Sequence, residues 1–452
     1  MLAKTQQKET QLMRYLKGIN PLIKRFKKYL FAVVILQGSL MSANIEHIDI
    51  DGIKIPVVFE KQKSLPILNL QLVFQNSGYI QDKNKSGLAS FSSKLLNEGT
   101  KELGSTKFAQ KLEENAISLD TSTGFETFVI ELSNLKDVSE KSIELLAQLI
   151  KSPNYSEDTL KKLKTLKIGE LKRRENDFDY TAKNLLKANL FKGTALANPS
   201  SGTLDTIKDI NLKDIKTFIS NTVNLNNLII VAGGDFNYKE FKKLIKPVLD
   251  ALKPGIKREL EEINFVSKND EETLIKETEQ AYIYFGSSYK VTASDKNRYI
   301  AKVASFILGG SGFGSRLMEE IRVKRGLAYS AYGSVSINKS HTFFSGYLQT
   351  KNETAKEAQA LVKEIIKEFV KKGVTKDELK AAKNFLTGSE PLRNEVLSQR
   401  LNKAFTLYYR GLDQDYPKKE LELIQDLKLE DLNKFIRSHE EINNLTFAIV
   451  RK

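Results

Sequence analysis

The sequence contains no cysteine and only three histidines in 452 residues. The lack of cysteine excludes disulfide bonds, thiolate metal ligands, a cysteine nucleophile and lipid attachment to a lipoprotein cysteine. His47, His341 and His439 lie far apart in the sequence, and no two of them have the spacing of a metal-ligand pair. A histidine-based catalytic triad or a histidine-rich metal site is therefore not expected.

Long hydrophobic runs are also missing. No run of about 18 apolar residues occurs, so a conventional transmembrane helix is not expected. The apolar fraction of 40% is ordinary, and 452 residues are enough for two or more domains. The net charge is +15, but the lysines are scattered and no RNA-binding aromatic motif or zinc finger accompanies them. Nucleic-acid binding is therefore not expected.

The first 43 residues are typical of a targeting segment. A basic stretch at 24–28 precedes an apolar stretch at 30–36 and the small residue Ala43, which is the pattern of a secretory signal. We expect export to the periplasm or cell envelope. An uncleaved segment that anchors the chain to the membrane is the alternative, and Met13 is a second candidate start.

The rest of the chain reads as two similar halves, offset by roughly 215 residues. Strand-like segments at 69–74 and 281–286 each lead into a helix, from about Ser86 and Ser294 respectively. Strand-like segments at 128–132 and 343–348 are followed by helices at 140–150 and 355–371. Capped helix starts then follow at Ser156 and Thr375. This alternation predicts an α+β fold with two homologous domains, each an antiparallel sheet with helices on one face. We expect domains at 44–252 and 273–452, joined by a charged linker at 253–272.

A helix in the first half has the shape of a zinc-binding helix without its zinc chemistry. In the inverted motif His-x-x-Glu-His, two histidines bind zinc and the glutamate activates water. The matching positions here are Ser90, Ser93 and Lys94, in the stretch Gly87–Thr100. A serine and a protonated lysine do not bind zinc as a pair, and Ser93 cannot act as a general base. No metal is therefore expected in this chain.

A glycine-rich stretch in the second half, Gly309-Gly310-Ser311-Gly312, resembles a nucleotide-binding loop only superficially. No Lys-Ser/Thr follows at the spacing of a phosphate-binding loop, and the pattern Gly-x-Gly-x-x-Gly is absent.

Two blocks carry a family resemblance that covers nearly all of residues 45–450. The first runs from Gly87 to Thr100, and the second combines the stretch 308–317 with Glu320–Ser330. The chain resembles the pitrilysin/insulinase superfamily of zinc metallopeptidases, specifically its short-chain branch of processing peptidases and bacterial relatives. The resemblance implies that the two domains are arranged as a clamshell.

The resemblance also assigns roles to residues. The family's third zinc ligand corresponds to Glu170, 76 residues beyond Lys94, whereas an accompanying family glutamate is replaced by Leu163. Glu170 is then either a relic of the zinc site or a pairing partner for Lys94, and the plainer alternative is an ordinary surface glutamate of a helix. Arg322 and Tyr329 match a family pair that holds the substrate carbonyl and the oxyanion from the second domain, with Gly309–Gly312 near the substrate. The plainer alternative is that Arg322 pairs with a nearby acid and Tyr329 packs at the start of a strand.

Some members of this family divide the active site between two chains, and this sequence has the signature of the chain without zinc. The resemblance therefore implies a non-catalytic subunit of a zinc-dependent peptidase that processes peptides or presequences. It would form a heterodimer with a homologous, zinc-bearing subunit and supply Arg322 and Tyr329 to that subunit's site. The substrate peptide would add as a strand at a sheet edge that corresponds to Leu72–Ser77 in whichever chain holds the zinc. The alternative is a catalytically inactive peptide-binding or scaffold homodimer.

Overall fold

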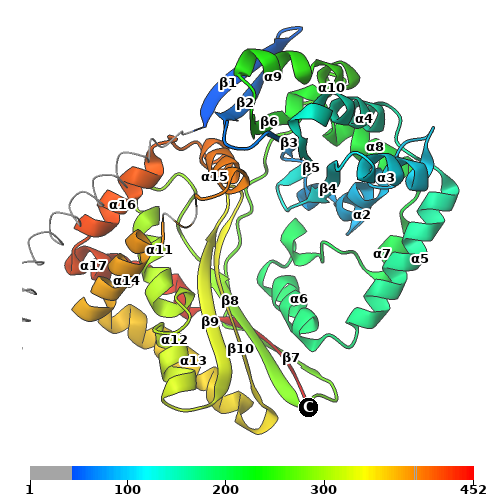
Figure 1. Cartoon of the computed structure of the whole chain (residues 1–452). Coiled ribbons are helices and arrows are strands. Elements are labelled where there is room, and N and C mark those ends of the chain that lie inside the picture. The colour runs from blue at the N-terminus through cyan, green and yellow to red at the C-terminus, as the bar shows by residue number, and fades with distance from the viewer. Residues whose placement is uncertain (1–42, 391, 393) are drawn as a thin grey trace, which may run out of the picture. The chain divides into compact units, whose positions relative to one another are not determined.

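The protein is represented by a computed structural model, in which residues 43–390, 392 and 394–452 are described (Figure 1). These residues form an α+β fold with two β-sheets, so the predicted fold class is confirmed. The strands of one sheet lie between Asn44 and Gly234, and those of the other lie between Glu271 and Arg451. The predicted targeting segment lies outside the described residues, apart from Ala43.

The first sheet has six strands. In spatial order they are β1 (Asn44–Ile50), β2 (Ile53–Lys61), β6 (Leu228–Gly234), β3 (Ile67–Gln75), β5 (Thr127–Leu135) and β4 (Ser118–Thr123). All neighbouring pairs are antiparallel except β2 and β6, which are parallel. In this chain β3 is paired on both sides, and the peptide-binding edge expected at the corresponding segment of the zinc-bearing partner stays a prediction. The edges of this sheet are β1 and β4.

The second sheet has five strands. Their order is β7 (Glu271–Ile275), β11 (Thr446–Arg451), β8 (Gln280–Ser288), β10 (Thr342–Lys351) and β9 (Ala328–Ile337). Here too one pair, β7 and β11, is parallel while the others are antiparallel. Each sheet is therefore mixed rather than purely antiparallel, because a late strand returns beside an earlier one.

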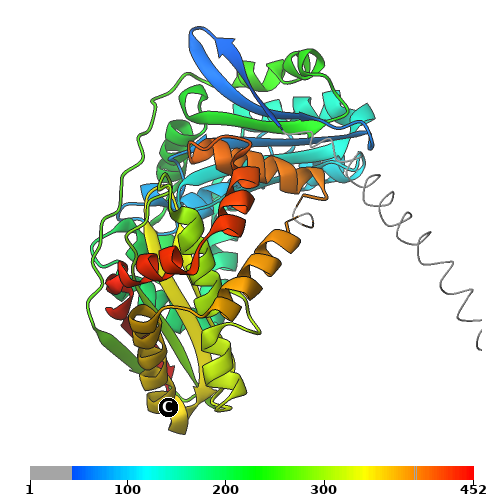
Figure 2. The ribbon, with the colours of Figure 1, turned by 90° about the vertical axis from the view of Figure 1, so that its left-hand side faces the viewer.

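The helices pack around these sheets (Figures 1 and 2). In the first half they are α2 (Leu88–Leu96), α3 (Gly104–Glu113), α4 (Ser139–Lys151), α5 (Glu157–Arg174), α6 (Phe178–Leu190), α7 (Leu204–Asp209), α8 (Leu212–Thr222), α9 (Tyr238–Leu244) and α10 (Lys246–Ala251). In the second they are α11 (Arg298–Ser305), α12 (Arg316–Met318), α13 (Ala355–Lys372), α14 (Lys376–Gly388), α15 (Leu397–Tyr409), α16 (Tyr416–Asp426) and α17 (Leu429–Arg437), with π-helical turns at η5 (Phe306–Gly310) and η6 (Glu319–Val323). The 3-10 turns are η1 (Tyr79–Gln81), η2 (Lys136–Val138), η3 (Ala195–Ala197), η4 (Leu225–Asn227), η7 (Asn352–Thr354) and η9 (Glu440–Asn443).

The strand sequences bury apolar side chains on both faces of each sheet. In β3, Leu72 and Phe74 join the main core of the first half, whereas Val73 points to the opposite face. In β8, Ile283 and Phe285 join the main core of the second half, and Tyr284 packs on the other side. Since successive strand residues alternate between faces, both faces need a cover.

Each half contributes one helix to the open face of the other half's sheet. Helix α6 packs against β8 and β11, and Leu186 and Leu190 share a cluster with Ala448. Helix α15 packs against β2 and β6, and Leu397 and Leu401 share a cluster with Val231. The prediction that helices cover only one face is therefore incomplete. The helix on the second face comes from the distant half, which local sequence patterns do not reveal.

The segment expected to be a linker has an extended course. Residues 254–270 contain no helix or strand, and Figure 2 shows that they connect the first sheet to the second along one side of the molecule. The segment contacts both halves, because the Arg258 carbonyl accepts a hydrogen bond from Asn76 Nδ2 at 2.8 Å and Ile263 N donates to the Ser340 carbonyl at 2.8 Å. Among the described residues, no helix has both the length and the apolar character needed to cross a bilayer.

Candidate functional site

The start of helix α2 is shaped by a glycine and an aspartate. Gly87 has a φ of +89°, and a Cβ there would lie 2.7 Å from Gly202 Cα, so a larger residue does not fit. The buried Asp82 carboxylate accepts hydrogen bonds from Gly87 N at 2.8 Å and Ala89 N at 2.7 Å. Asp82 therefore caps the free N–H groups at the start of α2 and fixes where the degenerate motif begins.

The three motif positions are not arranged as metal ligands. Ser93 is buried, and its hydroxyl donates to the Ser90 carbonyl at 2.8 Å, so it is used within the helix. Lys94 is half exposed, and its Nζ lies 3.5 Å from Glu170 Oε2. The predicted pairing of Lys94 with Glu170 is therefore present, and a cation occupies the position where the motif would place a zinc ligand.

Two further cations contact Glu170. Lys167 Nζ lies 3.1 Å from Oε2, and Arg174 Nη2 lies 2.8 Å from Oε1. Burial raises the pKa of the Glu170 carboxyl, but Lys167, Lys94 and Arg174 together hold it below its usual value. Burial lowers the pKa of the Lys167 ammonium, an effect that Glu170 opposes. The carboxylate is therefore ionised and already saturated with positive partners.

Zinc does not fit this cluster. A zinc site needs three or four neutral or anionic donors, and Glu170 is the sole carboxylate among the predicted ligand positions. Leu163 belongs to the hydrophobic core and offers no donor. In the part of the chain that the structure describes, no group of three or more His, Cys, Asp or Glu side chains could hold a metal ion.

The second predicted pair lies in the other half, on η6 and β9. Tyr329 follows the first residue of β9, where the pairing with β10 shifts register between Leu348 and Thr350. An irregularity of this kind re-aims side chains at a sheet edge. The Tyr329 side chain is 84% exposed, so the expectation that it packs at the strand start is wrong.

Arg322 is held between two aromatic rings. Its Cζ lies 4.7 Å from the centre of the Phe313 ring and 5.0 Å from that of Tyr329. Within the described residues, its guanidinium has no carboxylate partner. The neighbouring Glu320 instead pairs with Lys324 at 2.6 Å and Arg325 at 2.8 Å. The plainer expectation, that Arg322 pairs with a nearby acid, is therefore wrong.

The glycine-rich stretch packs closely on β9. A Cβ on Gly309 would lie 2.5 Å from the backbone N of Gly333, so this glycine lets the π-helical turn approach the strand. Gly310 ends that turn, and Ser311 and Gly312 follow it, the latter with a φ of +64°. Gly309 therefore has a packing role, and substrate contact by Gly309–Gly312 stays a prediction.

Sequence reasoning missed Lys167 and Arg174, which contact Glu170, and it also missed Phe313 and Asp82. Phe313 directly follows the glycine-rich stretch, but its stacking on Arg322 depends on the fold of η6. Asp82 precedes α2 by several residues, which is farther than the usual capping position. The turn at 82–87 brings its carboxylate to the backbone N–H groups of Gly87 and Ala89. An aspartate before a glycine-led helix start was the available signal.

Fold and site together define a metallopeptidase scaffold in which Ser90, Ser93 and Lys94 stand at the positions of the metal-binding motif. The chain belongs to peptidase family M16. Residues 57–204 match the family described as "Insulinase (Peptidase family M16)", and residues 209–386 match the "Peptidase M16 inactive domain". The expected family resemblance is thereby confirmed.

Two relatives illustrate the likeness in sequence. The chain is 44% identical over 423 residues to the "Non-peptidase homolog YmxG" of Helicobacter pylori, covering 93% of this chain and 98% of that protein. It is 23% identical over 318 residues to the "Uncharacterized zinc protease YmxG" of Bacillus subtilis, covering 70% and 77%. The first of these relatives and the match to the inactive domain support a catalytically inactive member of the family.

Solved structures show the same fold. The peptidase M16 inactive domain from Pseudomonas fluorescens superposes with a TM-score of 0.83 at 23% identity, covering 90% of this chain and 98% of that one. A protease from Helicobacter pylori superposes with a TM-score of 0.78 at 20% identity, covering 91% and 100%. At these identities the likeness concerns the fold alone.

Proposed function

We propose that this chain is the non-catalytic subunit of a zinc-dependent peptidase, and that it supplies Arg322 and Tyr329 to the active site of a homologous partner bearing the intact His-x-x-Glu-His motif. The observation that carries the proposal is the state of Arg322, which is stacked between two exposed rings and has no carboxylate partner among the described residues. A guanidinium left unpaired at a surface is available for a negatively charged group.

The chemistry of the pair suits an oxyanion. A guanidinium and a phenol are strong hydrogen-bond donors, and donors aimed at developing negative charge contribute about 3–4 kcal/mol to transition-state stabilisation. The Phe313 and Tyr329 rings restrict the Arg322 side chain, so less conformational freedom is lost when it engages a substrate carbonyl. In this proposal the zinc and its activated water belong to the partner.

The proposed substrate is an unfolded peptide or presequence that adds as a strand to a sheet edge of the partner. Strand addition uses main-chain hydrogen bonds and therefore accepts many sequences. We further propose that the complex works in the periplasm or cell envelope, with membrane contact only through residues 1–43 if that segment is retained. N-terminal sequencing of the mature protein from cell fractions tests this location.

The experiment for the proposed function is affinity purification of the full chain from its native cell. We expect a co-purifying chain with an intact His-x-x-Glu-His motif, zinc in the complex, and peptidase activity in the complex but not in the isolated chain. Recovery of a zinc-free assembly of identical chains that binds peptides without cleaving them would instead support the scaffold alternative.

A further inference from the structure

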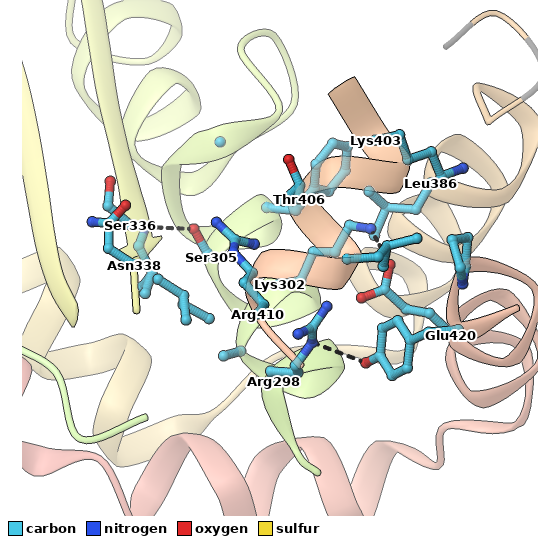
Figure 3. Close-up of a pocket in the computed structure, with 18 of the residues that line it drawn as sticks. Arg298, Lys302, Ser305, Ser336, Asn338, Leu386, Lys403, Thr406, Arg410 and Glu420 are labelled. Carbon is cyan, nitrogen blue, oxygen red and sulfur yellow. Dashed lines mark hydrogen bonds and ion pairs between the residues drawn. The ribbon is translucent and has the colours of Figure 1, made fainter. Parts of the chain in front are cut away.

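A large cavity lies within the second half of the chain. It has a volume of about 790 Å³, opens to the surface and is lined by residues of α11, η5, β9, α14, α15 and α16, including Gly310 of the glycine-rich stretch (Figure 3). Ligand-binding cavities commonly have volumes of roughly 300–1,000 Å³. The size of this one is therefore suitable for a small organic molecule.

The charged residues of the wall are unevenly paired. Lys302 Nζ lies 2.5 Å from Glu420, and Lys403 forms an ion pair with Glu390. Both carboxylates that line the cavity are thus already neutralised by lysines.

Two arginines remain in the wall, and they differ in their side-chain contacts with the described residues. Arg298 donates to the Tyr416 hydroxyl at 3.1 Å and to the Ala293 carbonyl at 2.9 Å. Arg410, at the end of α15, makes no side-chain hydrogen bond or ion pair with any residue that the structure describes. Figure 3 shows it beside Arg298 and Lys302 among the residues that line the cavity.

The environment of Arg410 is costly for an unpaired cation. Burial lowers the pKa of its guanidinium, and Arg298 lowers it further, while Glu126 and Glu420 oppose these effects. Glu126 is already used, because its Oε1 accepts from Ser340 N at 2.7 Å and from Ser340 Oγ at 2.5 Å. An oxyanion in the cavity would supply the missing partner, and a planar guanidinium binds such groups with two parallel hydrogen bonds.

The remaining wall combines polar residues with an apolar part. The apolar part includes Phe306, Val335, Ile337, Leu386 and Leu407. We propose that this cavity binds a small amphipathic anion, whose oxyanion pairs with Arg410 and whose apolar body packs against these side chains. The oxyanion is a carboxylate or a phosphate monoester. The proposal is independent of the peptidase role proposed above.

Calorimetric titration of the full chain tests this proposal with three probes that share one alkyl chain: octanoate, octyl phosphate and octanamide, each below its micelle concentration. We expect at least one anion to bind, and the neutral amide to bind at least tenfold more weakly, because it lacks the charge that Arg410 needs. The anion that binds more tightly shows whether the cavity prefers a carboxylate or a phosphate monoester.

Variants locate the bound anion. Arg410→Gln and Thr406→Phe should each weaken binding at least tenfold, the first by removing the cation and the second by filling the space. Arg410→Lys, which keeps the charge without the planar fork, should retain part of the affinity and shows that loss in Arg410→Gln is not misfolding. Arg437→Gln, at an exposed position on α17, is the matched control and should not change binding.

Four results would overturn the proposal. Three of them are equal affinity for octanamide and the anions, no binding of either anion, and unchanged anion binding in Arg410→Gln. Unchanged binding in Thr406→Phe would place the anion outside the cavity and would equally overturn it.

Discussion

Lys94 and Glu170, separated by 76 residues, form an ion pair of 3.5 Å at the place where the M16 motif would hold zinc. The isolated chain should therefore retain no zinc. Three cations surround the one remaining carboxylate ligand, and a divalent cation would have to displace them. Elemental analysis after dialysis against a weak chelator checks this, and near-stoichiometric zinc would contradict our account of positions 90–94.

Restoring the motif should recover zinc binding more readily than activity. The triple variant Ser90→His, Ser93→Glu and Lys94→His completes a ligand set with Glu170 as the third donor. Lys167 would still compete for that carboxylate, so adding Lys167→Met should tighten zinc binding about tenfold or more. Zinc titration with a competing chelator measures both steps. A folded triple variant without zinc binding would show that Glu170 is not the vestigial ligand.

Asp82 should make stability depend on pH between about 4 and 7. Burial raises the pKa of its carboxyl to about 7, although the N–H groups of Ala89 and Gly87 oppose the shift. The folded state therefore binds more protons than the unfolded state in this range, and acidification favours folding at this residue. Relative to Asp82→Asn, the wild type should gain about 2 kcal/mol as the pH falls from 7 to 5.

Melting temperatures of the two proteins across this range provide the measurement. Carboxylates whose pKa is lowered, such as Glu170 and Glu378, affect both proteins alike and cancel in the difference. A difference that stays constant with pH would rule out this role of Asp82.

The contact between α15 and the first sheet contains a buried ion pair. Arg400 Nη2 lies 2.7 Å from Glu60 Oε1, and Glu60 is only 3% exposed. Arg400→Met should destabilise the fold by about 3–5 kcal/mol, because it leaves a buried charge without a partner. The double variant Glu60→Met/Arg400→Met should recover much of that loss.

Denaturant unfolding measures these effects. The matched control is Lys246→Met, which breaks an exposed pair with Asp250 and should cost less than about 1 kcal/mol. Equal losses in the single and double Arg400 variants would show that the side chains contribute by packing alone.

The sequence predicted the local structure better than the long-range arrangement. The expected strand at 69–74 is β3, and the expected capped helix starts at Ser156 and Thr375 are the N-caps of α5 and α14. These depend on neighbouring residues, whose pattern is visible locally. The insertion of β6 between β2 and β3 depends on a strand more than 150 residues later, and no local pattern encodes it.

The same distinction holds for the site. Pairing of Lys94 with Glu170 was one of the alternatives that the sequence left open, and this ion pair is present. Arg322 and Tyr329 were identified from family spacing, and their side chains are in contact. The stacking of Phe313 on Arg322, and the engagement of Glu320 by Lys324 and Arg325, were not expected. They depend on which way each side chain leaves the π-helical turn η6, and composition does not determine that direction.

The central claim is that this chain completes a partner's active site, and the effect of Arg322→Ala on the turnover of the purified complex tests it most directly. We expect turnover to fall about 10²–10³-fold, with folding and complex formation nearly unchanged. Tyr329→Phe should lower turnover more mildly, and Arg322→Lys should recover only part of it, because an ammonium lacks the planar fork. Lys161→Ala, at an exposed position on α5, is the control and should leave turnover unchanged. Full turnover of an active complex that carries Arg322→Ala would contradict the shared-site account and favour a scaffold role.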